Sequence, residues 1–95
     1  MSSANEAQNL RIDPATLGDL DDLVELVMEL FSLEEDFQPD RRKQQHGLKL
    51  ILEQPNRGRI FVIRSEDKII AMVNLLFTIS TAEGGMVILL EDCIV

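Results

Sequence analysis

The 95-residue sequence predicts an α+β fold with the element order β-α-α-β-β-β. Two observations predict it. Apolar, β-branched runs in the C-terminal half are separated by polar turns, which is the pattern of antiparallel hairpins. Ahead of them, two stretches carry apolar residues at helical spacing. We therefore expect one domain over residues 10–95, with a mainly antiparallel sheet flanked by helices, after a small, polar and flexible N-terminus over residues 1–9.

Three strands are predicted over residues 60–64, 68–79 and 86–95, with polar turns at 65–67 and 80–85. The middle strand is apolar on both faces. Strict alternation would point one set of side chains one way (Ile69, Ala71, Val73, Leu75 and Phe77) and a second set the other way (Ile70, Met72 and Leu76). Because such a strand needs cover on both faces, we expect helices from elsewhere in the chain to pack on the sheet.

The N-terminal half supplies a short strand and two helices. Residues 10–15 form a strand with Leu10 and Ile12 inward, and Pro14 keeps it from continuing as a central strand. Thr16 with Asp19 three residues later signals the start of a helix. Its apolar stripe is Leu20, Leu23, Val24, Leu26, Val27, Leu30 and Phe31. A second helix begins near Pro39 and Asp40, since Asp is a favoured cap, and stops before Pro55.

Composition excludes several classes of protein. A hydrophobic content of 45% and a charged content of 27% are those of an ordinary globular chain. The net charge of −8 argues against nucleic-acid binding. It favours a cationic partner such as an amine, although an acidic balance more often only keeps a protein soluble. No run suits a membrane span or a signal peptide, so we expect a cytoplasmic protein. One cysteine and an isolated His46 predict neither a disulfide nor a metal site.

Three stretches together resemble a known family. They are RIDPATLGDLDDLVEL, GRIFVIRSEDKIIAMVNLLFTIST and EGGMVILLEDCIV, in this order and spacing. They resemble the first half of a GNAT-superfamily N-acetyltransferase, from its first strand through its fourth, and the resemblance covers nearly all of residues 10–95. It implies transfer of an acetyl group from acetyl-CoA to a primary amine, on a small molecule or a peptide. The amine would attack the thioester directly, without a covalent enzyme intermediate.

The adjacent carboxylates Glu91 and Asp92 are the candidate catalytic residues. In an apolar strand they are expected to face opposite sides of the sheet, and a carboxylate there indicates a cleft. The resemblance implies that a glutamate on this strand acts as the base, and Glu91 is our candidate. The alternative is that both charges are simply solvated at an open strand end.

The resemblance also implies where both substrates lie. The backbone of Cys93, Ile94 and Val95 would run alongside the pantetheine arm of acetyl-CoA, with the Cys93 side chain buried as a small hydrophobe. The acceptor amine would lie near three residues in the region between the first and second helices, Phe31, Glu34 and Glu35. Acidic side chains there suit a cationic amine, but a solvated loop explains them equally well.

The sequence departs from the family's pattern beyond residue 95. A glycine- and arginine-rich turn that opens a helix normally follows the fourth strand and holds the pyrophosphate. That turn is missing here, and the chain has no tyrosine to protonate the leaving thiolate. We therefore expect a truncated domain, naturally short or a fragment, that binds acetyl-CoA weakly and is inactive as this chain alone.

Residues 86–95 are also expected to form an exposed edge. An unpaired apolar edge strand tends to pair with another chain. The sequence thus predicts a homodimer that joins these strands about a two-fold axis. It also leaves a second function open, a non-catalytic α+β interaction module that dimerises through the fourth strand.

Overall fold

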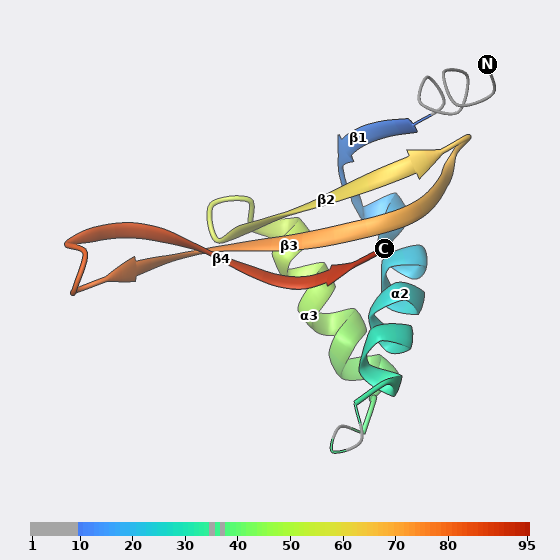
Figure 1. The fold of residues 1–95 in the computed structure, drawn as a ribbon, viewed down its shortest axis with the longest axis horizontal. Coiled ribbons are helices and arrows are strands. Elements are labelled where there is room, and N and C mark those ends of the chain that lie inside the picture. Colours follow the sequence, from blue (N-terminus) through green and yellow to red (C-terminus); the bar gives the residue numbers. More distant parts are fainter. Residues whose placement is uncertain (1–9, 35, 37) are drawn as a thin grey trace.

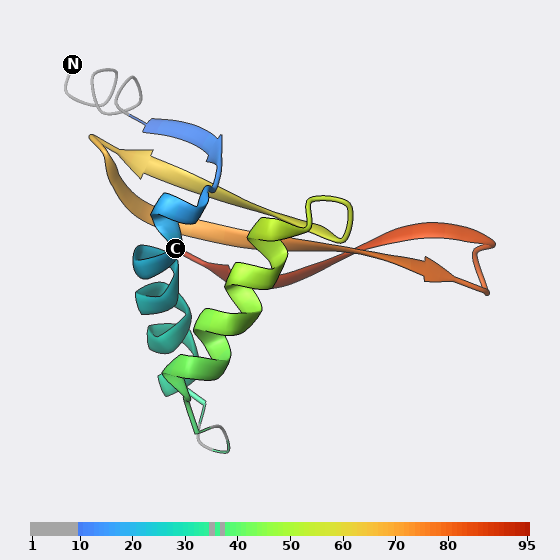
Figure 2. The same cartoon turned by 180° about the vertical axis from the view of Figure 1, so that it is seen from behind.

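The computed structural model describes residues 10–34, 36 and 38–95. Its elements follow the predicted order, and Figures 1 and 2 show them from opposite sides. They are β1 (Leu10–Pro14), the 3-10 helix η1 (Leu17–Asp19), α2 (Leu20–Ser32), α3 (Arg41–Glu53), β2 (Gly58–Ser65), β3 (Lys68–Ser80) and β4 (Gly85–Ile94). The strands form one antiparallel sheet in the order β1-β2-β3-β4. The predicted α+β class is confirmed. The flexible segment predicted for residues 1–9 lies outside the described residues.

Both helical segments begin at the predicted positions, where a side-chain oxygen accepts a hydrogen bond from a backbone N–H. The backbone N–H of Thr16 donates to Oδ2 of Asp19 at 2.9 Å, which satisfies a backbone donor ahead of η1 and α2. The side chain of Asp40 accepts a hydrogen bond from the backbone N–H of Arg42 at 3.1 Å, at the start of α3. An ion pair between Arg41 and Glu25 joins the two helices near this cap.

Tight turns connect the three long strands. Glu66 and Asp67 join β2 to β3 with φ values of 50° and 73°, the left-handed conformation that matches the twist of a two-residue hairpin. Gly84, with φ of 73°, closes the turn between β3 and β4. These turns fix the register on which the site depends.

Helices α2 and α3 lie on one face of the sheet only (Figure 2). The core between them is formed by Leu23, Val24, Val27, Leu48, Ile60, Val62, Ile69 and Met72. The expectation of cover on both faces is wrong for the described residues, since no described helix packs on the opposite face. The inward placement of Leu10 and Ile12 is wrong for the same reason. Their strand lies at an edge, and Ile12, 73% exposed, lines a hollow on the uncovered face.

A bulge in β3 changes which of its residues reach the core. Ile63 pairs with Ala71 and Arg64 pairs with Ile69, so Ile70 is an extra residue in β3. Ile69 therefore packs in the core with Met72, while Ile70 is exposed. The strict alternation predicted for this strand is wrong before the bulge and holds after it, where Met72 and Val73 face opposite sides.

The molecule is elongated, with extents of 50 × 32 × 25 Å. The long dimension comes from the β3–β4 hairpin, whose tip projects well beyond both helices (Figure 1). Several large apolar side chains on this projecting part are exposed, namely Ile79, Met86, Ile88, Leu89 and Leu90. No helix within the described residues is long and apolar enough to cross a membrane.

Candidate functional site

A second bulge, in β4, brings the two candidate carboxylates to the same side of the sheet. Asn74 pairs with Glu91 and Met72 pairs with Ile94, so β4 has one residue more than β3 over this interval. Asp92 adopts the left-handed conformation with φ of 49°, which an aspartate tolerates better than most residues. The expectation that Glu91 and Asp92 face opposite sides is therefore wrong. Both residues line the hollow under the helices.

Asn74 holds the bulge from the neighbouring strand. Its Nδ2 donates a hydrogen bond to Oδ2 of Asp92 at 2.7 Å. The Asn74 side chain is 1% exposed, and its Oδ1 meets no hydrogen-bond donor within the described part of the chain. The amide orientation follows from chemistry, because a carboxylate only accepts hydrogen bonds and so must face the NH₂ group. A buried acceptor without a donor costs about 1–3 kcal/mol, and in native proteins such an atom requires an explanation.

The hollow beside Asn74 has a volume of about 210 Å³ and combines apolar walls with a polar floor. The walls come from α2 and α3, and the floor from β3 and β4. The lining residues are Val27, Phe31, Lys43, Gln44, Gly47, Leu48, Ile51, Asn74, Glu91 and Asp92. An apolar pocket with a few convergent polar groups is the usual form of a small-molecule site.

The predicted acceptor residues are only partly brought together. Phe31, in the last turn of α2, lines the hollow with Glu91. Glu34 is exposed in the segment after α2 and does not line it, so the structure does not bring it to the site. Glu35 lies outside the described residues. The carboxylates at the hollow come from β4 rather than from the loop after the first helix.

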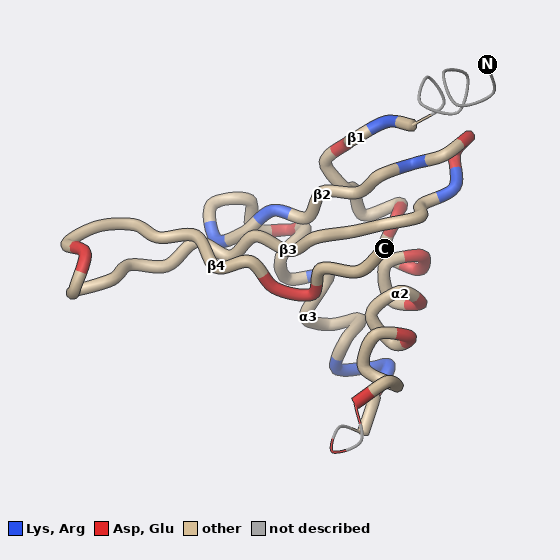
Figure 3. The backbone as a smooth tube through the Cα atoms, viewed as in Figure 1, with Lys and Arg blue, Asp and Glu red and all other residues tan. Residues whose placement is uncertain are grey.

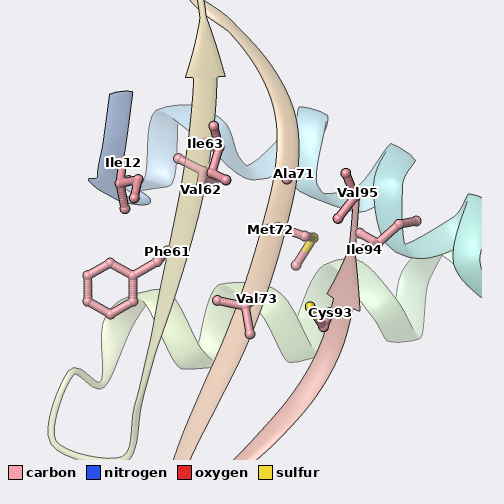
Figure 4. Close-up of a pocket in the computed structure, with 10 residues that line it drawn as sticks. All are labelled: Ile12, Phe61, Val62, Ile63, Ala71, Met72, Val73, Cys93, Ile94 and Val95. Carbon is pink, nitrogen blue, oxygen red and sulfur yellow. The ribbon is translucent and has the colours of Figure 1, made fainter. Parts of the chain in front are cut away.

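The three predicted cofactor residues follow the bulge directly. Ile94 pairs with Met72 and packs against the core, while Val95 is 98% exposed. Cys93 is exposed, and its predicted burial is wrong because this face of the sheet has no described helix over it. Figure 4 shows the hollow on this face, about 230 Å³ in volume, with Cys93 and Val95 on one side and Phe61 and Ile12 on the other.

Charge is distributed unevenly around the hollow. Lys43 is the single cation among its lining residues and is exposed, whereas Glu91 and Asp92 give two carboxylates. Figure 3 shows these as the red stretch of β4 between α3 and the C-terminus. The described residues contain no group of side chains that could hold a metal ion. The net negative charge of the residues that line the hollow favours a cationic ligand over an anionic one.

Asn74 was missed as a site residue, although the sequence carries a signal for it. It is the one polar residue in the run KIIAMVNLLF after its first lysine. A lone amide in a strand that is apolar on both faces must be buried, and it must find a partner or a ligand there. The bulge at Asp92, in contrast, has no such signal, since Asp at that position also suits a solvated strand end.

Comparisons with known proteins identify the fold. No protein-family model matches the sequence, and no curated protein matches it. Solved structures do. A possible acetyltransferase from Clostridium difficile 630 superposes with a TM-score of 0.80 at 22% identity, over 90% of this chain and 57% of that chain. A predicted acetyltransferase from Clostridium acetobutylicum, solved with acetyl-CoA, gives 0.71 at 15% identity, over 88% and 58%.

A third similar structure was solved as a complex with a small molecule. It is the aminoglycoside acetyltransferase meta-AAC0020 from an uncultured soil metagenomic sample, in complex with sisomicin, with a TM-score of 0.64 at 22% identity, over 94% of this chain and 57% of that chain. The chain thus spans less than two thirds of the length of each of these structures. The described residues have the fold of the N-terminal part of a GNAT acetyltransferase.

Proposed function

We propose that this chain forms the acceptor side of a GNAT-type N-acetyltransferase, which transfers acetyl from acetyl-CoA to a primary amine. One observation carries the proposal. Glu91 and Asp92 line the hollow under the helices, and the next residues of β4 continue along the edge of the described sheet. The acetyltransferase fold supports the reaction class. The two substrates, acetyl-CoA and a primary amine, belong to the proposal.

Glu91 is the proposed general base. An ammonium must lose a proton before its nitrogen can attack, and Glu91 lies at the hollow where such a group would enter. The neutral amine then attacks the thioester carbonyl, an N–C bond forms, and the C–S bond breaks. The thiolate of the coenzyme leaves and takes up the proton that the attacking nitrogen loses as the amide forms.

The edge of β4 fits the pantetheine arm of acetyl-CoA. Cys93, Ile94 and Val95 follow the bulge, and no described strand pairs with the outer edge of β4. Amide groups of an extended ligand can hydrogen-bond to such an edge as an added strand does. No described residues form a glycine-rich turn into a helix after β4, so we expect the 95-residue polypeptide alone to bind acetyl-CoA weakly and to be inactive or nearly so.

The decisive measurement is the melting temperature with and without acetyl-CoA. A ligand that binds only the folded state stabilises it by RT ln(1 + [L]/Kd). With a Kd of about 1 mM and ligand at about 5 mM, the gain of about 1 kcal/mol raises Tm by about 4–8 °C. ADP is the control for unspecific nucleotide binding. A flat Tm, or an equal rise with ADP, would remove the coenzyme site from the proposal.

The role of Glu91 has its own test. Glu91→Gln keeps the shape of the side chain and should leave the acetyl-CoA shift of Tm unchanged. Any acetyl transfer, measured as thiol release, should fall by about 100-fold or more, as expected for a lost general base. Glu83→Gln, in the exposed turn between β3 and β4, is the matched control and should not change the rate. Where the unmodified chain gives measurable thiol release, equal rates for both variants would exclude Glu91 as the base.

A second candidate function rests on a different observation. β4 is an edge strand of the described sheet, and its Met86, Ile88 and Leu90 are exposed. An apolar edge strand of this kind tends to pair with a strand of another chain. In this alternative the chain is a non-catalytic module that forms a homodimer through residues 86–95. Light scattering should then give twice the monomer mass, and Ile88→Lys should restore the monomer. A stable monomer at micromolar concentration would exclude this dimer.

A further inference from the structure

We propose that the uncovered face of the sheet, opposite α2 and α3, binds the same face of a second copy of this chain. The two sheets pack against each other about a two-fold axis. This contact differs from the pairing of β4 edges considered above, because it is made by side chains of β2, β3 and β4 and leaves the outer edge of β4 free. It does not depend on the proposed reaction.

The uncovered face is apolar over three neighbouring strands. Phe61 pairs with Val73, and directly opposite residues have their side chains on the same face. Because side chains alternate along a strand, three further pairs toward the hairpin tip share this face, namely Leu75 with Leu90, Phe77 with Ile88 and Ile79 with Met86. The face is thus apolar from the hollow beside Val95 to the end of the projecting hairpin.

The exposed apolar surface on this face is large enough for a stable dimer. Six of its side chains are 60–98% exposed, namely Ile12, Ile79, Met86, Ile88, Leu90 and Val95. At about 100 Å² of apolar surface for each, they present on the order of 600 Å². The partly exposed Phe61 and Val73 add to this, which brings the face near the roughly 800 Å² that each partner buries in a standard interface. An apolar patch of this size marks an interaction surface.

The shape of the face suits a second copy of the same chain. At one end is the hollow of about 230 Å³, with Phe61 on one side and Cys93 on the other (Figure 4). At the other end, Ile79 and Met86 are exposed on the hairpin that projects beyond the helices (Figure 1). At about 30 Å³ for each water-sized group, the hollow holds about seven such groups, or about two side chains of the size of Ile or Met. A two-fold axis repeats every contact, so each hairpin would fill the hollow of the other copy.

The distribution of charge also favours self-association. Two copies that each have a net charge of −8 repel each other unless their contact avoids the acidic groups. The acidic residues of the described strands are Asp13, Glu91 and Asp92, and all three lie on the helix side of the sheet. Arg59 is a cation on the uncovered face, and its Nε donates to the backbone oxygen of Pro55 at 3.3 Å, which holds it beside the segment before β2. A face without carboxylates is where one acidic chain can approach another.

The mass of the 95-residue polypeptide in solution tests the proposal. Sedimentation equilibrium from about 1 to 500 µM should show a reversible change from one to two chain masses, with a Kd on the order of 10 µM. The rate at which Cys93 reacts with a thiol reagent should fall over the same range, because its thiol is exposed on the face that the dimer covers. A monomer throughout this range that binds an apolar dye would overturn the proposal and assign the face to a different partner.

Two neighbouring residues distinguish this contact from edge pairing. Leu90, 66% exposed, lies on the uncovered face opposite Leu75, whereas Leu89, 50% exposed, lies on the other face opposite Leu76. Leu90→Lys should raise the Kd of the dimer at least about tenfold, because it places an unpaired charge in the contact. Leu89→Lys makes the same change of charge on the same edge strand and should change the Kd less than about threefold. Equal effects of the two variants would identify edge pairing and overturn the proposal.

Val73 provides a second test, on a strand without a free edge. β3 lies between β2 and β4, so its side chains reach a second copy only across the face of the sheet. Val73→Lys should therefore also raise the Kd at least about tenfold, and an unchanged Kd would overturn the proposal. If this variant fails to fold, the comparison of Leu90→Lys with Leu89→Lys decides.

The result is separate from that of the proposed enzyme. A dimer of this kind without an acetyl-CoA effect on Tm would keep the face contact and remove the coenzyme site. A monomer whose Tm rises with acetyl-CoA would do the reverse.

Discussion

At the scale of single residues, Arg64 makes the most connected polar contact of the described chain. Its Nη1 and Nη2 donate to the two carboxylate oxygens of Asp19 at 2.9 and 2.7 Å, and its Nε donates to Asp13 at 2.9 Å. The side chains of Arg64 and Asp19 are 15% and 12% exposed. A bidentate pair of this kind is geometrically specific. It ties β1 and the start of α2 to the middle of the sheet.

Arg64→Gln should therefore destabilise the fold strongly. The substitution leaves Asp19 buried without its cation, which costs more than the loss of an exposed ion pair. We expect a loss of about 2–3 kcal/mol in the free energy of unfolding, measured by urea denaturation. Arg42→Gln is the control, because its side chain is exposed, and should cost less than about 0.5 kcal/mol. Equal losses for both would mean that the pair does not stabilise the fold.

The same pair makes stability depend on acid pH. The hydrogen bonds from Arg64 lower the pKa of Asp19, against the opposing effect of burial. In the unfolded chain an aspartate has a pKa of about 3.9. Because the folded pKa is lower, the stability that Asp19 contributes is complete above the unfolded pKa and is lost as the pH falls through the folded value.

Asp19→Asn should be less stable at pH 7 but should lose less stability between about pH 5 and 2. Urea denaturation across this range measures both, with the exposed Asp21→Asn as control. Parallel losses in the wild type and Asp19→Asn would contradict this prediction.

At the scale of elements, the junction of α3 and β2 depends on a glycine. A Cβ on Gly58 would lie 2.9 Å from the backbone oxygen of Leu75 and 3.4 Å from the Ile51 side chain. Backbone atoms in the middle of a paired strand cannot yield cheaply. The absence of a side chain at Gly58 therefore lets α3 end close against β3.

Two Gly→Ala variants should move stability in opposite directions. Gly58→Ala is expected to cost about 1–3 kcal/mol through overpacking. Gly47→Ala, within α3, has nothing within 4 Å of the added methyl group and should gain about 0.5–1 kcal/mol from helix propensity. Thermal and urea unfolding of both variants measure the pair. A loss at both positions would mean that helix propensity does not limit α3.

The boundaries of the helices and strands were predictable from local sequence signals. The face of the sheet on which individual side chains lie was not. Thr16, Asp40 and the turn at Glu66 are local signals, and each marks an element boundary that the structure confirms. The bulges at Ile70 and Asp92 arise from how two strands accommodate each other, and a single strand carries no record of its partner's register. The adjacent carboxylates Glu91 and Asp92 could thus be singled out from the sequence, but their common face could not.

At the scale of the whole molecule, stability should be unevenly distributed. The part of β3 over residues 69–76 lies under the helices, whereas the tip of the β3–β4 hairpin projects away from them (Figure 1). Local opening requires little free energy where few apolar contacts must break. Amides of residues 78–88 should therefore exchange with deuterium much faster than those of residues 69–76, as measured by NMR. Equal protection along both strands would indicate that the projecting hairpin is covered in solution.

The uncovered face could not be predicted from composition. Phe61, Val73 and Ile12 are as apolar as Val62 and Met72, so their composition does not show which of them face the helices. Which apolar face receives the two described helices depends on where η1 and α2 turn after β1, a matter of tertiary packing. The fold class was predictable from the sequence, but the difference between a covered and an open face required the structure.

The bulge in β4 also determines how the strand accommodates one additional residue without changing which face its later side chains take. Side chains alternate with a period of two, so Asp92, as one additional residue, would reverse the sides of everything after it if the bulge did not absorb it. Deleting Asp92 would restore the uninterrupted ladder, with Cys93 opposite Val73 and with Ile94 still opposite Met72 and facing the core. A one-residue deletion would thus remove one carboxylate from the hollow and leave the facing of the end of the strand unchanged.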